Sequence, residues 1–180
     1  MKNIIGLYSP AAQSGKSTVA KFLAQECGYE VVPFAQTLKE MLIPMLKALG
    51  YSDDEAYRLV HVDKAVVVPR AEVSVRHMMR TLGTEWGRSC IHPEVWLRCW
   101  EERIKPYTLV VVDDVRFPNE AELIGRLGGE MWWVERPNVL RTHEHASEGG
   151  LDTYQQFTKV IMNDGSLNAL VDKLRTLAQP

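Results

Sequence analysis

The fold is decided by the stretch Asn3-Ile4-Ile5-Gly6-Leu7-Tyr8-Ser9-Pro10-Ala11-Ala12-Gln13-Ser14-Gly15-Lys16-Ser17-Thr18. Residues 3–8 are almost all apolar, which predicts a buried strand. Residues 16–27 carry their apolar side chains on one face, which predicts an amphipathic helix that Gly28 can end. The pattern therefore predicts a strand, a short loop and a helix in direct succession.

The loop matches the P-loop motif G-x-x-x-x-G-K-[ST], except that Pro10 stands where the first glycine is expected. Backbone N–H groups and a helix N-terminus make such a loop a phosphate site. We expect Lys16 to bridge the β- and γ-phosphates of a nucleoside triphosphate and the Ser17 hydroxyl to hold Mg²⁺. A chance Gly-Lys-Ser at a helix start is the competing interpretation, which the strand before the loop disfavours. The residues expected to bind the triphosphate are Gln13, Ser14, Gly15, Lys16, Ser17 and Thr18.

Composition limits the class of protein. The chain has 180 residues, which fits one domain, and 21 basic against 23 acidic side chains give a net charge of −2. No basic field therefore points to a nucleic-acid polymer. The three cysteines have no C-x-x-C spacing, which favours a reduced, cytoplasmic protein. There is no apolar run of about 18 residues, so we expect no membrane span.

Apolar runs alternate with amphipathic stretches along the rest of the chain. This alternation predicts a parallel sheet of about five strands with helices on both faces, the three-layer α/β arrangement of P-loop proteins. Ligands of such sheets bind beyond the carboxyl ends of the strands. Further strands are expected at 29–34, 107–113, 131–134 and 159–162, and residues 66–69 are either a connection or a minor strand. Further helices are expected at 38–49, around 75–82, and at 93–104 and 118–127. Residues 52–55 predict a capping box that opens a short helix. A last helix is expected at 166–177, with its inward side chains at Leu167, Leu170, Val171 and Leu174.

Two adjacent acids end the strand expected at 107–113. Val110-Val111-Val112-Asp113 has the form of a Walker B segment, so Asp113 or Asp114 would hold the Mg²⁺ hydration shell. Because successive side chains of a strand point in opposite directions, only one of the two should face the metal, and the sequence leaves open which. The alternative is that both acids cap a turn.

Arginines collect where an anion would bind. Arg76 and Arg80 are four residues apart and share a helix face, while Arg116 and Arg136 come just after two strand ends. Guanidinium groups suit phosphates, and phosphoryl transfer needs positive charge on donor and acceptor. The alternative is a solvated face with scattered salt bridges.

Aromatic residues and a polar segment complete the candidates. Trp86, Trp96 and Trp100 lie in one short stretch, and we expect Trp96 to stack on a nucleobase while at least one of the three packs in the core. Residues 137–152 are polar and contain glycines, which predicts a flap that closes over the nucleotide and keeps water out. His143-Glu144-His145 within it is interpreted as flap polarity or a phosphate contact rather than a zinc site.

Several segments form a recognisable set in this order along the chain. They are Ser14-Gly15-Lys16-Ser17-Thr18, Phe34-Ala35-Gln36-Thr37-Leu38-Lys39, Arg80-Thr81-Leu82-Gly83-Thr84-Glu85-Trp86-Gly87-Arg88, Asp114-Val115-Arg116-Phe117-Pro118-Asn119-Glu120-Ala121, and Asn163-Asp164-Gly165-Ser166. As a set they resemble the bacteriophage-type deoxynucleoside monophosphate kinases.

The resemblance implies an adenylate-kinase-like fold and transfer of a phosphoryl group from ATP, with Mg²⁺, to a deoxynucleoside monophosphate. It also implies that Arg136 neutralises charge on the transferred group, so that the expected catalytic set is Lys16, Asp114, Arg116 and Arg136. The residues that it places around the acceptor are Lys39, Arg70, Arg76, Gly83, Thr84, Trp96 and Arg116, to which the helix face adds Arg80.

These observations together predict one kinase domain over residues 1–180, with an acceptor-binding helical region at about 36–105 and the flap at about 137–152. Its partners would be small nucleotides, with no nucleic-acid polymer and no membrane, and the sequence leaves a homodimer open. It would work in the cytoplasm, that of the host for a phage protein. The alternatives are a kinase for another small acceptor, such as dephospho-coenzyme A, and a nucleotide-dependent switch without catalysis.

Overall fold

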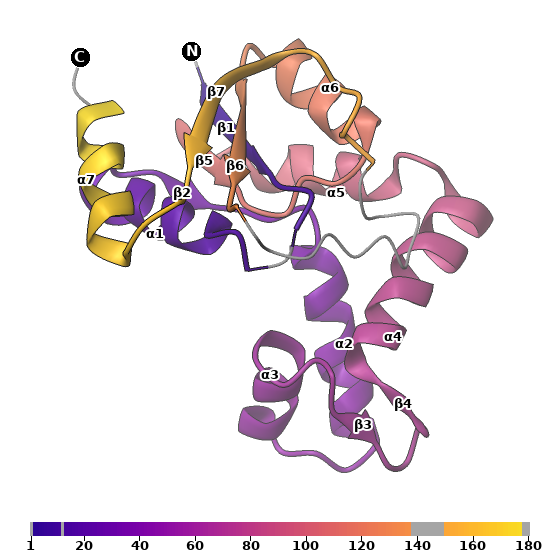
Figure 1. Cartoon of the computed structure of the whole chain (residues 1–180). Helices are drawn as coiled ribbons and strands as arrows, with labels where there is room; N and C mark the ends of the chain where they lie inside the picture. The colour runs from indigo at the N-terminus through magenta and orange to yellow at the C-terminus, as the bar shows by residue number, and fades with distance from the viewer. Residues whose placement is uncertain (1, 12, 138–149, 178–180) are drawn as a thin grey trace. The chain divides into compact units, whose positions relative to one another are not determined.

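The structure, a computed structural model, describes residues 2–11, 13–137 and 150–177, and the chain divides into two compact units (Figure 1). Met1–Pro33 and Arg103–Pro180 form the first, which we call the sheet unit. Phe34–Glu102 form the second, the helical unit. The acceptor-binding region expected at 36–105 overlaps the helical unit, and its role stays a prediction.

The sheet unit is built on five strands that are all parallel. Their order is β2-β5-β1-β6-β7, so the strand that leads into the P-loop lies in the centre. This confirms the predicted parallel sheet of about five strands. The strands are β1 (Asn3–Tyr8), β2 (Glu30–Val31), β5 (Leu109–Val112), β6 (Glu130–Glu135) and β7 (Phe157–Met162).

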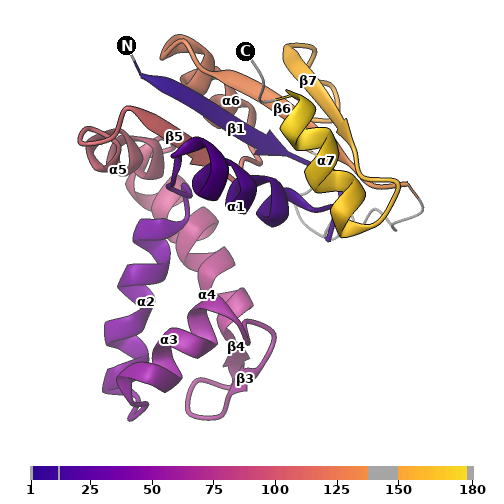
Figure 2. The ribbon, with the colours of Figure 1, turned by 90° about the vertical axis from the view of Figure 1, so that its left-hand side faces the viewer.

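Helices cover both faces of this sheet (Figure 2). On one face, α1 (Lys16–Cys27) and α7 (Leu167–Leu177) pack on Ile5, Leu7 and Val111 in one buried cluster. On the other face lies α6 (Pro118–Arg126), and a Cβ on Gly6 would come within 2.6 Å of its Ile124 side chain. The central strands are nearly fully buried because both of their faces are covered, which explains their continuous apolar sequences.

The helical unit has its own core. Leu46, Val60, Val68 and Val75 are fully buried in it. The predicted capping box is present, since Ser52 Oγ accepts from Glu55 N at 3.3 Å and Glu55 Oε2 accepts from Ser52 N at 2.8 Å. The elements are α2 (Gln36–Ala48), α3 (Asp53–His61), the antiparallel pair β3 (Val67–Val68) and β4 (Val73–Ser74), α4 (Val75–Thr81), the π-helix η1 (Leu82–Ile91) and α5 (Val95–Arg103).

Some details differ from the predictions. The strand expected at 29–34 is only Glu30–Val31, because it pairs with β5 at the edge of the sheet through two residues. Leu167 was expected to point inward but is 63% exposed, since it is the first residue of α7. The π-helix was not anticipated. Among the described residues, none of the helices combines the length and the hydrophobicity that a membrane crossing requires.

Candidate active site

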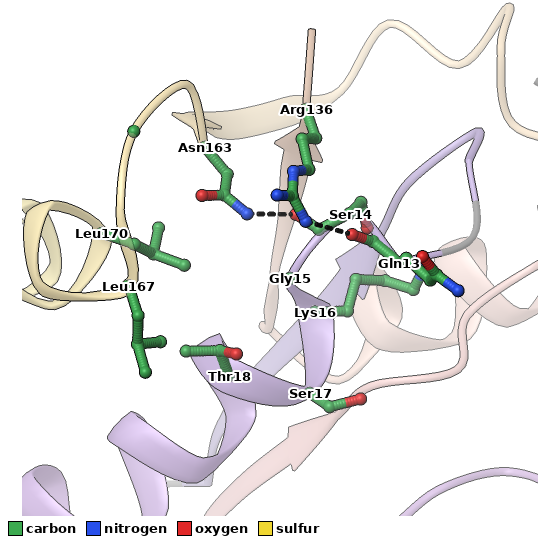
Figure 3. Close-up of a pocket in the computed structure, with 11 residues that line it drawn as sticks. Gln13, Ser14, Gly15, Lys16, Ser17, Thr18, Arg136, Asn163, Leu167 and Leu170 are labelled. Carbon is green, nitrogen blue, oxygen red and sulfur yellow. Dashed lines mark hydrogen bonds between the residues drawn. The ribbon is translucent and has the colours of Figure 1, made fainter. Parts of the chain in front are cut away.

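The P-loop lines an open cavity of about 370 Å³ where β1, β6 and β7 end (Figure 3). All six residues expected to bind a triphosphate contribute to it, and Arg136 faces them from the end of β6. The wall opposite comes from the segment after β7 and from α7. Its residues are Asn163, Gly165, Leu167 and Leu170.

The backbone of the loop bends through two left-handed residues. Gln13 has φ 56° and Gly15 has φ 105°, and Gly15 caps the N-terminus of α1. Alternation of handedness turns successive N–H groups toward one concave side, which is how backbone nests bind anions. Glycine is favoured at position 15 for two reasons. Its φ is in the left-handed region, and a Cβ there would lie 2.7 Å from Asn163 Nδ2. The loop reaches this shape with the buried Pro10 in place of the first glycine.

Two side chains, one just after β6 and one just after β7, donate hydrogen bonds to consecutive carbonyl groups of the loop. Arg136 Nη1 donates to Gln13 O at 3.2 Å, and Asn163 Nδ2 donates to Ser14 O at 2.8 Å (Figure 3). In a trans peptide the N–H points opposite to the C=O. Each of these hydrogen bonds therefore fixes the direction of the next amide, which belongs to Ser14 in the first case and to Gly15 in the second.

The Lys16 ammonium lies among charges of both signs. Burial is the main cause that lowers its pKa to about 8, and the Arg116 guanidinium lowers it further. The carboxylates of Asp113 and Asp114 oppose both effects. Four residues that the sequence singled out separately thus act on one another in the structure. A partly desolvated cation attracts a phosphate more strongly than one in water.

A buried carboxylate, Glu120, holds the segment that carries Arg116. It is 3% exposed, and its Oε2 accepts from Arg116 N at 2.7 Å and from Phe117 N at 3.1 Å. A Cβ on Gly150 would lie 2.5 Å from Arg116 O, so Gly150 packs closely on this backbone. Sequence reasoning assigned Glu120 no part in the site. The available signal was an acid two residues after Pro118, where it can satisfy the first amides of a helix.

The residues present fit a Mg²⁺ ion that is held jointly with phosphates. Within residues 2–11, 13–137 and 150–177, no group of three His, Cys, Asp or Glu side chains could hold a metal alone. Mg²⁺ usually takes one or two carboxylates and completes its shell with phosphate oxygens and water. Ser17 is exposed at the start of α1, and Asp113 and Asp114 follow β5. Asp113 and Asp114 are equally suited to supply the carboxylate ligand of the Mg²⁺ ion.

The residues expected around the acceptor, apart from Arg116, belong to the helical unit. Arg76 and Arg80 are both exposed on α4, and Arg70 donates a hydrogen bond to Leu49 O. Trp96 differs from the expectation of a base-stacking ring, because it is only 4% exposed and its Nε1 donates to Gly83 O at 2.8 Å. The others in this unit are Lys39 on α2 and Gly83 and Thr84 on η1.

Most of the predicted flap, including His143-Glu144-His145, lies outside the described residues. Its last residues, 150–152, are described and belong to the sheet unit. Leu151 is buried, and the Tyr8 hydroxyl donates to Asp152 Oδ1 at 2.5 Å. The end of β1 and Asp152, the last residue of the predicted flap, are thus in direct contact.

Comparison with known proteins gives a consistent result. A family model described as deoxynucleotide monophosphate kinase matches residues 45–174. A protein of Acanthamoeba polyphaga mimivirus, whose name assigns it provisionally to this activity, is 25% identical over 174 residues, which cover 89% of each chain. A deoxynucleoside-5'-monophosphate kinase of Escherichia phage T5 is 43% identical over 54 residues, 29% of this chain and 22% of that one.

One solved structure supports the fold. The dephospho-CoA kinase of Campylobacter jejuni resembles the chain with a TM-score of 0.50 at 12% identity, over 98% of this chain and 95% of that one. At this level of identity the likeness concerns the three-layer P-loop fold.

Anion binding should weaken as the pH rises through about 8, because Lys16 in the free protein loses its proton there. A bound polyphosphate favours the charged form, so binding above pH 8 should take up a proton at Lys16. Calorimetry with inorganic triphosphate at pH 7 and pH 9, each in two buffers of different ionisation enthalpy, measures this uptake. Lys16→Arg, which keeps its charge, is the control, and an equal uptake at pH 9 in both proteins would contradict the assignment.

The hydrogen bond from Asn163 should matter for binding. Asn163→Ala leaves the buried Ser14 carbonyl without this donor and frees its peptide to turn, so inorganic triphosphate should bind about tenfold more weakly. Asn168→Ala, at an exposed position of α7, is the matched control and should bind as the parent does. Unchanged affinity in a folded Asn163→Ala protein would show that the contact does not shape the loop.

Proposed function

The chain belongs to the deoxynucleotide monophosphate kinase family, and we propose that it transfers the terminal phosphoryl group of ATP, bound with Mg²⁺ at the P-loop, to a deoxynucleoside monophosphate. The observation that carries the donor side of this proposal is the cavity that residues 13–18 line together with Arg136, in which charges of Asp113, Asp114 and Arg116 act on the P-loop lysine, Lys16. A phosphate loop with a desolvated cation and adjacent carboxylates suits a triphosphate with its metal.

On the donor side, the amides of residues 13–18 and the Lys16 ammonium would bind the phosphates of ATP. The Ser17 hydroxyl and either Asp113 or Asp114 would hold Mg²⁺, which when bound offsets the charge of the β- and γ-phosphate oxygens. Arg136 already contacts the loop through Gln13 O, which puts a second cation beside the cavity.

The transfer itself needs little covalent help from the protein. An oxygen of the acceptor phosphate forms a bond to the γ-phosphorus while the bond from that phosphorus to the β–γ bridging oxygen breaks, and ADP leaves. The acceptor oxygen is already ionised, so no strong base is needed. Two polyanions must instead be held in line, and we assign Lys16, Arg116 and Arg136 to offset their repulsion.

On the acceptor side, we assign the cationic residues of the helical unit to the deoxynucleoside monophosphate. Arg76 and Arg80 are exposed one turn apart on α4, which suits a phosphate group. Arg70 donates one N–H to Leu49 O, and a guanidinium group has four further N–H donors. Lys39, Gly83 and Thr84 complete the set carried over from the family resemblance.

The three free cysteines, Cys27, Cys90 and Cys99, support a reducing, cytoplasmic location.

An acceptor assay tests the proposal. ADP formation from ATP and Mg²⁺ should be seen with one or more of dAMP, dGMP, dTMP and dCMP, and the products should be the matching diphosphates. Dephospho-coenzyme A, the acceptor of the alternative kinase assignment, belongs in the same panel. Turnover with dephospho-coenzyme A and with none of the four nucleotides would refute the proposal.

Removal of the P-loop cation should abolish transfer without unfolding the protein. Lys16→Met keeps the aliphatic stem and removes the charge, so kcat should fall at least a hundredfold, the order seen when one charge-stabilising group is lost. Lys21→Met is the matched control, because Lys21 is an exposed lysine of the same helix and its loss should change kcat little. A similar loss in both variants would contradict the role of Lys16.

A further inference from the structure

The helix that carries the Gly83-Thr84 segment is unusual. From Val75 to Ile91 the chain runs through α4 directly into the π-helix η1, ten residues long. π-helical hydrogen bonds span five residues instead of four, and most π-helices are single turns that occur at functional sites. A π-helix of this length needs a specific interaction that disfavours the ordinary α-helical register.

The Trp96 indole supplies such an interaction. Its Nε1 donates a buried 2.8 Å hydrogen bond to Gly83 O, the carbonyl that an α-helix would pair with Gly87 N. A Cβ on Gly87 would lie 2.4 Å from Trp96 Cζ2 and 2.5 Å from Nε1. The indole therefore lies against the helix backbone between Gly83 and Gly87, at the place where one α-helical hydrogen bond would form.

Two neighbouring contacts match the wider register. Ser89 Oγ donates to Thr84 O at 3.2 Å, across the five-residue spacing of a π-helix. At the end of η1, His92 N donates to Gly87 O at 2.9 Å, again five residues apart. Gly87 thus has two functions, since its missing side chain admits the indole and its carbonyl ends the helix.

We propose that Trp96 is a positioning residue for the acceptor side, a wedge that holds residues 82–91 in the π-helical register. The effect of the wedge on acceptor binding rests on the proposed function, because that function assigns Gly83 and Thr84 to the acceptor. A return to the α-helical register would turn the later side chains of the segment about the helix axis. Thr84 and Arg88 would then change direction, although the chain would remain helical.

This role replaces the base-stacking role expected for Trp96. A ring that is 4% exposed has little face to offer a ligand, while its N–H and its edge are both used on the helix. Trp96 thus acts through the residues of η1.

The first test compares Trp96→Phe with Trp100→Phe. Both tryptophans are buried on α5, but Trp100 packs on Phe34, with ring centroids 4.6 Å apart, so its truncation costs similar core packing. Trp96→Phe loses the hydrogen bond to Gly83 O, so the KM of the deoxynucleoside monophosphate should rise about fivefold to tenfold while the KM of ATP changes less than twofold. Trp100→Phe should leave the ratio of the two KM values unchanged.

Hydrogen exchange of the amides of residues 82–91 gives a readout that does not depend on catalysis. Exchange in this segment should be faster in Trp96→Phe than in Trp100→Phe. Unchanged exchange together with an unchanged acceptor KM would overturn the wedge. If the parent protein turned over none of the nucleotides, the proposed function would fail, and the exchange comparison would still decide the role of Trp96.

The second test substitutes glycines, so it does not depend on a folded Trp96→Phe protein. Gly→Ala in a helix ordinarily stabilises, and Gly125→Ala on α6, where nothing lies within 4 Å of the new Cβ, should raise Tm by about 2 °C. Gly87→Ala should instead lower Tm and speed exchange of residues 82–91, because the methyl group meets the indole. A rise in Tm for Gly87→Ala equal to that for Gly125→Ala would contradict the proposal.

Discussion

The hydrogen bond from Asn163 to the Ser14 carbonyl joins the segment after the last strand to the loop after the first, and we expect the shape of the P-loop cavity to depend on this contact. Asn163 also donates its backbone N–H to Glu135 O at 2.7 Å, so it spans β6, β7 and the P-loop. Arg136 adds a contact of the same kind one residue earlier in the loop. The parallel order of the sheet is what brings residues about 150 positions apart to one edge, because the carboxyl ends of parallel strands lie together.

The positive charge at this edge of the sheet is local and does not reflect the net charge of the whole chain. The net charge is −2, yet Lys16, Arg116 and Arg136 lie around one loop. Burial, and after it the Arg116 guanidinium, lowers the pKa of Lys16, so its charged form is disfavoured when no ligand is bound. A bound polyanion would favour the charged form of the lysine. Glu120 stabilises the cluster indirectly, because it holds the backbone of Arg116 from a buried position.

Much of this architecture could be predicted from periodicity and from one motif. Apolar runs predicted β1 and β5, and Gly15-Lys16-Ser17 predicted the P-loop that lines the cavity, since these signals are local in sequence. The contacts of Glu120 are local in the chain, and their signal, an acid two residues after Pro118, was overlooked. The contact of Asn163 could not be predicted, because it depends on where another strand ends in space. The π-helix was missed for a similar reason, since Leu82–Ile91 has ordinary helical composition and the register depends on Trp96 beyond its end. Trp96 itself was assigned by residue type, which cannot tell a core indole from an exposed one.

The lowered pKa of Lys16 has a chemical consequence apart from phosphate binding. An amine with a pKa of about 8 is neutral in roughly a quarter of molecules at pH 7.5, whereas an ordinary lysine is neutral in well under one in a hundred. Only the neutral amine is a nucleophile. We therefore expect Lys16 of the empty P-loop to react with acylating reagents at neutral pH more readily than an ordinary lysine does, and a bound polyphosphate to protect it both sterically and by keeping its proton in place.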